Sequence, residues 1–95
     1  MFLGAYHFDG DRTELVAAHD RLAAQFPPGT FDLHVCVAVD DGIVVFDACP
    51  SREVFDAFSQ SADFLDALAA AGLPAPRVEP LGDVHSAELR AAVTP

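Results

Sequence analysis

The sequence has no lysine, and its five basic residues are all arginine, against fifteen aspartates and glutamates. The formal net charge is therefore −10 at pH 7. Five scattered arginines cannot form a basic patch, so nucleic acid and anionic membrane surfaces are poor partners for this chain. We interpret the acidity as a contribution to solubility.

Cysteines and long apolar runs are also scarce. Two cysteines do not make a disulfide framework in a chain of 95 residues, and Cys36 and Cys49 are expected to lie diagonally across a hairpin, which is a poor disulfide geometry. We therefore expect reduced thiols and a cytoplasmic protein. No apolar run approaches the length of a membrane span, and the N-terminus lacks the basic and apolar regions of a secretory signal, so we expect neither a membrane segment nor a signal peptide.

Apolar residues, in contrast, are abundant. They make up 52% of the sequence, which is enough for a small core, and the length favours one domain over residues 1–95. Alternation of side chains predicts a strand over 2–8. A helix is expected to follow the N-cap candidate Asp11 and to stop at Pro27-Pro28-Gly29, since proline cannot continue a helix.

The second half of the chain predicts another helix and another strand. The helix is expected to start after Ser51 as its N-cap and to end at Gly72, with a kink or short break at Ser59-Gln60-Ser61, because serines there compete for backbone hydrogen bonds. A fourth strand over 77–86 follows, and Pro80 inside it indicates an edge position. The last nine residues are expected to form a short helix or a loose tail.

Between these halves lies a predicted hairpin over residues 33–49. Asp41-Gly42 is a favoured pair for a two-residue type I′ turn, because both central residues need positive φ, and this turn predicts Asp40 opposite Ile43. Alternate residues then fall on two faces. One face is entirely apolar and consists of Val35, Val37, Val39, Val44, Phe46 and Ala48. The other face is mixed and small and consists of His34, Cys36, Ala38, Val45, Asp47 and Cys49.

The order β-α-β-β-α-β predicts an α+β, ferredoxin-like fold, in which two helices cover one face of a four-stranded antiparallel sheet. We expect the apolar face of the hairpin to pack against these helices and the mixed face to stay open. An open, partly apolar sheet face on a small domain favours dimerisation. Two such sheets facing each other would form a dimeric barrel with a cavity inside, so a homodimer is expected.

The segments IVVFDACPSREVFDAF and SQSADFLDAL resemble the dimeric α+β barrel superfamily, and in particular its small antibiotic-biosynthesis-monooxygenase-like members from actinobacteria. Those proteins similarly run a strand into a helix that breaks near a serine. The resemblance covers nearly the whole chain, and it implies the dimeric barrel fold with cofactor-free monooxygenase-like chemistry. Members that oxidise aromatic polyketides or degrade haem usually carry Trp and His where this sequence has Cys49 and Phe58, so the resemblance implies no catalytic residue here.

Histidines and one aspartate are the candidate catalytic groups. His7, His34 and His85 fall on predicted strands. If His7 and His34 share the open face, the result is an acidic cavity with two imidazoles, which suit acid–base work at neutral pH. Asp47 could orient one of them. Tyr6 lies on the opposite face of its strand from His7, and His19 lies near the edge of the apolar stripe of the first helix. The alternative is that each histidine is a hydrogen-bonded packing residue.

The expected lining of this cavity is small and consists of Ala5, Cys36, Ala38, Val45 and Cys49. His34, Asp47 and the two thiols are also zinc-ligand types. Side chains on neighbouring strands project nearly parallel and converge poorly on one metal ion, so we predict neither a metal nor a cofactor. A cysteine nucleophile is not expected either, because an acidic neighbourhood raises the pKa of a thiol.

Three functions remain open at this point, of which the third is a metal-binding or stress-related protein that uses the histidines. The first is a homodimeric barrel that binds a small apolar or aromatic molecule between its sheets, with cofactor-free oxygenase or isomerase chemistry. The second is a non-catalytic interaction module in which the partner subunit fills the open sheet face. The small side chains of the mixed face favour the first function, because they leave room for a cavity.

Overall fold

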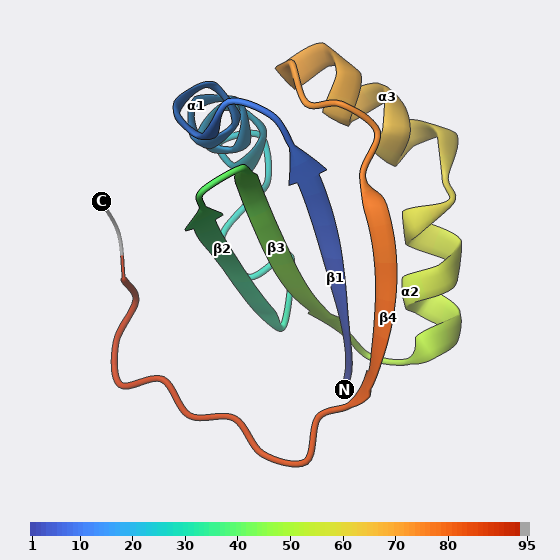
Figure 1. The fold of residues 1–95 in the computed structure, drawn as a ribbon. Helices are drawn as coiled ribbons and strands as arrows, with labels where there is room; N and C mark the ends of the chain where they lie inside the picture. The colour runs from blue at the N-terminus through green and yellow to red at the C-terminus, as the bar shows by residue number, and fades with distance from the viewer. Residues whose placement is uncertain (94–95) are drawn as a thin grey trace.

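The computed structural model describes residues 1–93 (Figure 1). Its elements are, in chain order, β1 (Phe2–Asp9), α1 (Arg12–Ala23), β2 (Leu33–Val39), β3 (Gly42–Cys49), α2 (Arg52–Ser59), α3 (Ala62–Ala71) and β4 (Arg77–Asp83). The strands form one antiparallel sheet in the order β2-β3-β1-β4, and the helices lie on one of its faces. The predicted α+β class and four-stranded antiparallel sheet are confirmed, and the second predicted helix is divided into α2 and α3.

Short polar side chains set the helix boundaries. The side-chain oxygens of Asp11, Ser51 and Ser61 accept the backbone N–H of a residue in the first turn of α1, α2 and α3, as N-caps do. Gly72 ends α3 in the left-handed region, with φ of 93°, which glycine adopts without steric cost. The predicted caps at Asp11, Ser51 and Gly72 are therefore confirmed. So is the predicted interruption, because Gln60 and Ser61 separate α2 from α3.

The predicted register of the hairpin is wrong. Val39 lies opposite Gly42, so Asp40-Asp41 forms the turn in place of Asp41-Gly42. Within residues 1–93 only glycines have positive φ, which excludes a type I′ turn at two aspartates. Gly42 serves a different purpose, because a Cβ at this position would overlap with the backbone carbonyl oxygen of Phe8 on β1. The glycine is required by the close approach of two strands.

The orientation of the hairpin is also the reverse of the prediction. The register shift is two residues, so each side chain keeps its predicted face, but the mixed face lies under the helices. Asp47 is 4% exposed, whereas Val35 and Val37 of the apolar face are 38% and 39% exposed. The expectation that the mixed face stays open is therefore wrong.

The pairing of β1 with β3 explains this reversal. Phe2, Tyr6 and Phe8 of β1 lie opposite Cys49, Val45 and Ile43 of β3, and residues opposite each other share a face. The mixed face of the hairpin thus continues the aromatic face of β1. Covering three aromatic side chains with helices removes more apolar surface from water than covering the valines would.

The core lies between this aromatic face and the helices. Phe55 of α2 and Phe64 of α3 both pack on Tyr6, with ring centroids 5.7 and 5.3 Å from the Tyr6 ring. Phe55 is 0% exposed. It lies over Gly4, where an added Cβ would overlap with the Phe55 ring. The side chain that is missing at Gly4 is what allows α2 to sit close to the sheet.

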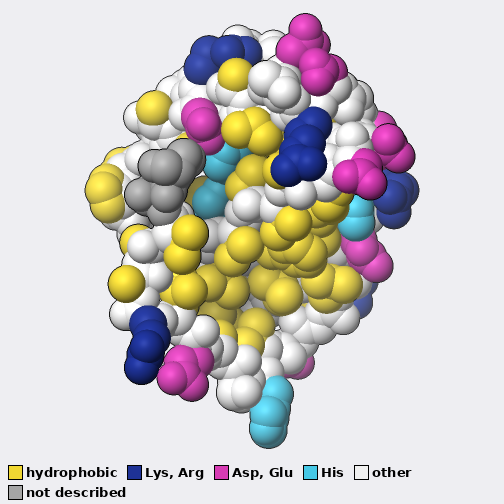
Figure 2. All heavy atoms as spheres, turned by 60° about the vertical axis from the view of Figure 1, so that its left-hand side comes forward, with side chains coloured by type: hydrophobic (Ala, Val, Ile, Leu, Met, Phe, Trp, Pro, Cys, Tyr) yellow, Lys and Arg dark blue, Asp and Glu magenta, His cyan; other side chains and the backbone are white. Residues whose placement is uncertain are grey.

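The other face of the sheet carries exposed valines. Val35, Val37 and Val39 project from β2 and are each more than one-third exposed. Figure 2, which turns the left-hand side of Figure 1 toward the viewer, shows hydrophobic side chains gathered in one broad field. We call the side of the sheet that carries Val35, Val37 and Val39 the valine face. A contiguous apolar patch of this kind is typical of an interaction surface.

The C-terminal part of the chain is less regular. β4 ends at Asp83, before the predicted Ser86, and it occupies the sheet edge that Pro80 predicted. Residues 84–93 contain neither helix nor strand, as expected for a loose tail, and Thr94 and Pro95 lie outside the described residues. Among residues 1–93, no helix has both the length and the apolar character needed to cross a membrane.

Candidate functional site

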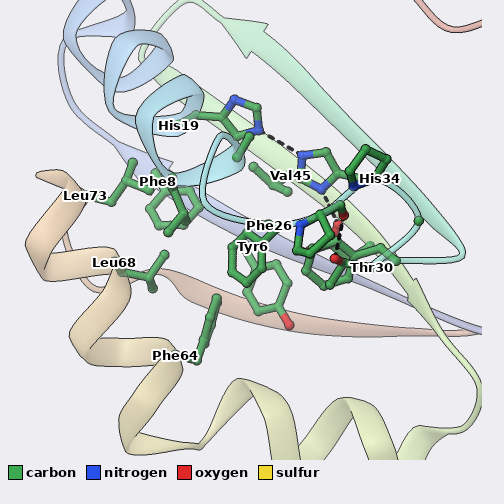
Figure 3. Close-up of a pocket in the computed structure, with 17 residues that line it drawn as sticks. Tyr6, Phe8, His19, Phe26, Thr30, His34, Val45, Phe64, Leu68 and Leu73 are labelled. Atoms are coloured by element: carbon green, nitrogen blue, oxygen red, sulfur yellow. Dashed lines mark hydrogen bonds and ion pairs between the residues drawn. The ribbon is translucent and has the colours of Figure 1, made fainter.

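A cavity of about 350 Å³ lies between the sheet, α1, α3 and the segment that joins α1 to β2. His19 and His34 lie on one side of it, and Phe64, Leu68 and Leu73 on the other (Figure 3). Most of its wall is apolar. The apolar side chains that line it include Tyr6, Phe8, Leu22, Phe26, Phe31, Val45, Phe64, Leu68 and Leu73.

A chain of four polar side chains runs along the histidine side of the cavity. His34 Nδ1 is 2.5 Å from Asp47 Oδ1, and His34 Nε2 is 2.8 Å from His19 Nε2. The other ring nitrogen of His19, Nδ1, is 3.0 Å from Asp20 Oδ1. The His34–Asp47 distance is shorter than that of a usual N–H···O hydrogen bond, and the other two distances are within the usual range. The two imidazoles thus connect a carboxylate on the sheet to a carboxylate on α1.

The fold brings these four groups together in two ways. His34 and Asp47 lie directly opposite each other on β2 and β3, so the strand register alone makes them neighbours. His19 follows the buried Ala18 on α1, and its position beside the apolar stripe carries its ring to the edge of the sheet. Phe31 completes the wall, since its ring stacks on His34 with centroids 5.6 Å apart.

Burial and negative charge raise the pKa of three groups near the cavity, Tyr6, Cys36 and Cys49. Burial raises the pKa of Tyr6, and the nearby Asp47 carboxylate raises it further. Burial also raises the pKa of the Cys36 thiol, with Asp20 and Asp47 adding to the effect. Burial likewise raises the pKa of the Cys49 thiol, and the Asp47 and Asp32 carboxylates raise it further. The expectation that acidic surroundings suppress thiolate formation is confirmed, although burial is the larger cause.

One buried polar group near the cavity, the Tyr6 hydroxyl, takes no part in this chain of hydrogen bonds. Tyr6 is 1% exposed, and its hydroxyl has no hydrogen-bond partner among residues 1–93. A buried hydroxyl without a partner is unfavourable by about 1 to 3 kcal/mol. With its pKa raised, this hydroxyl stays protonated at neutral pH and can donate a hydrogen bond to a ligand oxygen.

The structure brings together two of the three candidate catalytic residues. His34 and Asp47 are hydrogen-bonded to each other beside the cavity. His7 is not with them, because it lies opposite Val44 on the valine face and its Nε2 is 2.8 Å from Glu79. The expectation that His7 and His34 share one cavity is therefore wrong, and the cause is the alternation of side chains along β1.

The five residues expected to line a cavity between sheets are dispersed. Val45 lines the cavity under the helices. Cys49 belongs to the core and Cys36 packs against it, Ala38 is exposed, and Ala5 shares the side of β1 that carries His7. Neither cysteine forms a disulfide. Among the described residues, no group of three or more histidines, cysteines and carboxylates is arranged to hold a metal ion.

The sequence did not predict that two other residues, His19 and Tyr6, lie beside His34 at the site. His19 had a usable signal, because its position at the edge of an apolar helical stripe predicts a partly buried ring. Tyr6 also had one, since it was expected on the strand face opposite His7. Neither signal places these side chains beside His34, because that requires knowing which face of the hairpin the helices cover.

Comparisons with known proteins give no match for this chain: no protein-family model, no curated protein and no solved structure is similar to it at a significant level. The fold agrees with a ferredoxin-like arrangement in its α+β class and strand order. Such folds carry many unrelated activities. The function therefore has to be inferred from the side chains of the site.

Proposed function

We propose that this protein binds a small, largely aromatic molecule in the cavity between the sheet and the helices, and exchanges a proton with it through His34. The hydrogen bond from His34 to Asp47 at the edge of an apolar cavity supports this proposal most directly. A volume of about 350 Å³ falls within the usual range for small-molecule pockets.

The geometry around His34 is that of an oriented acid–base group. Its Nδ1–H donates to Asp47, which fixes the ring and leaves Nε2 on the far side. A carboxylate that holds an imidazole in one tautomer also stabilises its protonated form. Because Asp47 is buried, its charge is not screened by solvent. His34 can therefore act on a ligand oxygen or on an acidic C–H bond when the ligand takes the place of His19 at its Nε2.

Charge indicates which ligands are suitable. The chain carries a net charge of −10, and the residues that line the cavity include neither arginine nor lysine. An anionic ligand would find neither arginine nor lysine there and would be repelled by the Asp47 carboxylate, so an uncharged molecule is favoured. Aromatic walls with one polar side suit a fused or substituted ring that carries a hydroxyl or a carbonyl oxygen.

Two reaction classes start from proton transfer at such a ring. In an isomerisation, His34 removes a proton from one position and returns it at another. In a cofactor-free monooxygenation, a ring CH₂ loses its proton to His34 and the resulting carbanion reduces O₂. One oxygen atom then becomes a carbonyl on the ring, and the other leaves as water with the two hydrogens. The second class is the one that the resemblance to monooxygenase-like proteins implies.

A fluorescence titration with 1-naphthol, an uncharged two-ring hydroxyaromatic, tests binding. We expect saturable binding to the native protein, and binding weaker by about tenfold or more in His34→Ala and Asp47→Ala, which corresponds to loss of about 1.4 kcal/mol. His85→Ala is the matched control, because His85 is exposed and far along the chain in the C-terminal segment. No saturable binding to the native protein, or equal binding to all four proteins, would contradict the proposal.

The valine face supports a second proposal, a homodimer. Val35, Val37 and Val39 form an uncharged, exposed strip, and a second copy of the same strip is complementary to it in chemistry. Two like surfaces related by a twofold axis are the commonest way in which small proteins associate. In this dimer the sheets would face each other and the ligand cavities would stay on the outer, helical sides. A dimer that binds no small molecule would be a non-catalytic interaction module.

Light scattering after size-exclusion chromatography tests the dimer. The native protein is expected to have the mass of two chains, and Val37→Asp that of one, because a buried carboxylate without a partner prevents association. Val54→Asp is the matched control, since Val54 is 46% exposed on α2, on the helical side. A monomeric native protein, or a Val37→Asp variant that remains dimeric, would rule the valine face out as the interface.

A further inference from the structure

The hydrogen bonds between Asp47, His34, His19 and Asp20 allow their protons to be counted. A carboxylate can only accept, so the bond to Asp47 requires a proton on His34 Nδ1. By the same reasoning, the bond to Asp20 requires a proton on His19 Nδ1. The bond between the two Nε2 atoms requires one more proton, held by one ring and shared with the lone pair of the other.

Three N–H protons are therefore needed, whereas two neutral imidazoles supply only two. We propose that His19 and His34 share one additional proton, and that His19 with Asp20 connects the cavity to solvent. The pair then carries one positive charge between two carboxylates. The role in proton exchange assigned to this pair rests on the proposed function, but the proton count does not.

The other groups near the pair are neutral. Cys36 on β2 and Tyr6 on β1 have raised pKa values, so both keep their protons near neutral pH. The residues that line the cavity from α3 and from the segment after α1 are apolar or uncharged and do not titrate. The charge balance at this site is therefore set by the two carboxylates and the two imidazoles.

The two carboxylates at the ends of this chain of hydrogen bonds differ in their exposure to solvent. The Asp20 side chain is 56% exposed and that of Asp47 is 6% exposed. His34 lines the cavity, so a bound ligand would cover it, whereas Asp20 would stay in contact with water. When His34 transfers its Nε2 proton to a ligand oxygen, the pair keeps two N–H protons, and the third returns from water on the side where Asp20 is exposed. His19 is thus a positioning residue that holds the shared proton, and His34 is the group assigned to the ligand.

Nitrogen-15 NMR of the imidazole rings, without any ligand, measures the count. At a near-neutral pH at which the exposed His85 is neutral, the His19 and His34 rings together should hold three N–H protons. Asp20→Ala removes the acceptor that requires a proton on His19 Nδ1, so the pair should hold two. Asp66→Ala, which removes an exposed carboxylate from α3, is the matched control and should leave three.

His19→Gln provides a second measurement. The single ring left at the site, His34, should then be neutral with its proton on Nδ1, and the N–H signal shared between two rings should disappear. Two protons on the native pair, or no difference between Asp20→Ala and Asp66→Ala, would overturn the proposal. If NMR finds three N–H protons on the native pair but 1-naphthol does not bind, the shared proton is supported and the proposed function is contradicted. The two proposals can therefore fail separately.

Discussion

His34 and Asp47 lie directly opposite each other on β2 and β3, and the hydrogen bond between them lies on the helix-covered side of the sheet. Their burial is unequal, with a His34 side chain that is 33% exposed and an Asp47 side chain that is 6% exposed. This difference decides what happens when either partner is removed.

His34→Ala should be more destabilising than Asp47→Ala. Without His34, a buried carboxylate loses its partner, which costs about 2 to 3 kcal/mol, whereas without Asp47 the imidazole can still reach water, which costs about 1 kcal/mol. Urea denaturation of both variants and of the double variant gives the comparison. The double variant should lose less stability than the sum of the two single ones, and strict additivity would show that the side chains do not interact.

Tyr6→Phe should stabilise the protein by about 1 kcal/mol, because it removes a buried hydroxyl for which residues 1–93 offer no partner. The same change should weaken binding of a ring that carries a carbonyl oxygen, such as 1-tetralone, relative to a ring without one, such as tetralin. Thermal unfolding and a binding titration measure the two effects. A loss of stability in Tyr6→Phe would show that the hydroxyl already has a partner in solution.

Stability should decline at alkaline pH. The folded protein holds the protons of Cys36, Cys49 and Tyr6 more tightly than the unfolded chain does, because all three pKa values are raised. The contribution of the two thiols to folding stability is complete below their ordinary pKa of 9.0. It is lost as the pH rises above 9.0 and through their raised pKa values in the folded protein. Tyrosine adds to the loss above its ordinary value of 10.0.

Urea denaturation over a series of pH values from neutral to strongly alkaline checks this dependence. The contribution of these three groups to the free energy of unfolding should be constant up to the ordinary thiol pKa of 9.0 and should fall above it. Tyr6→Phe should remove the part of the fall that begins at the tyrosine value. Stability that increases over this range would mean that these groups ionise more readily in the fold than outside it.

Gly4→Ala should destabilise the protein by about 3 kcal/mol or more, because the new methyl group would overlap with the fully buried ring of Phe55 and force α2 away from the sheet. Phe55→Leu is the matched background, since leucine lacks the two ring atoms that lie nearest to the added Cβ. In that background Gly4→Ala should be clearly less destabilising than in the native protein. Chemical denaturation of the single and double variants is sufficient, and an equal effect of Gly4→Ala in both backgrounds would argue against the packing of Phe55 on Gly4.

Local patterns predicted the parts of the fold that depend on local chemistry. Asp11, Ser51 and Gly72 mark helix ends because their side chains or φ angles satisfy groups a few residues away, and the serines at 59–61 interrupt a helix for the same kind of reason. Sorting of the hairpin into two faces also succeeded, because alternation survives a register error of two residues.

The direction of the hairpin could not be obtained in this way. It depends on the pairing of β1 with β3, which joins residues about forty positions apart, such as Tyr6 with Val45. The same long-range pairing separates His7 from His34 and brings Tyr6 to the cavity. The role of Gly42 was predicted wrongly for a related reason, because the contact that excludes a side chain at this position is with the backbone of Phe8 on another strand.

The break at Gln60-Ser61 divides the helical layer into two parts with different tasks. α2 carries Phe55, which closes the hydrophobic interior over Gly4, while α3 supplies Phe64 and Leu68 to the wall of the cavity. An altered Leu68 side chain on α3 can therefore change the size of the compartment, whereas Phe64 also packs on Phe58 of α2, with ring centroids 4.5 Å apart. Through this division, evolution or protein engineering can vary which molecule is admitted while the scaffold is preserved.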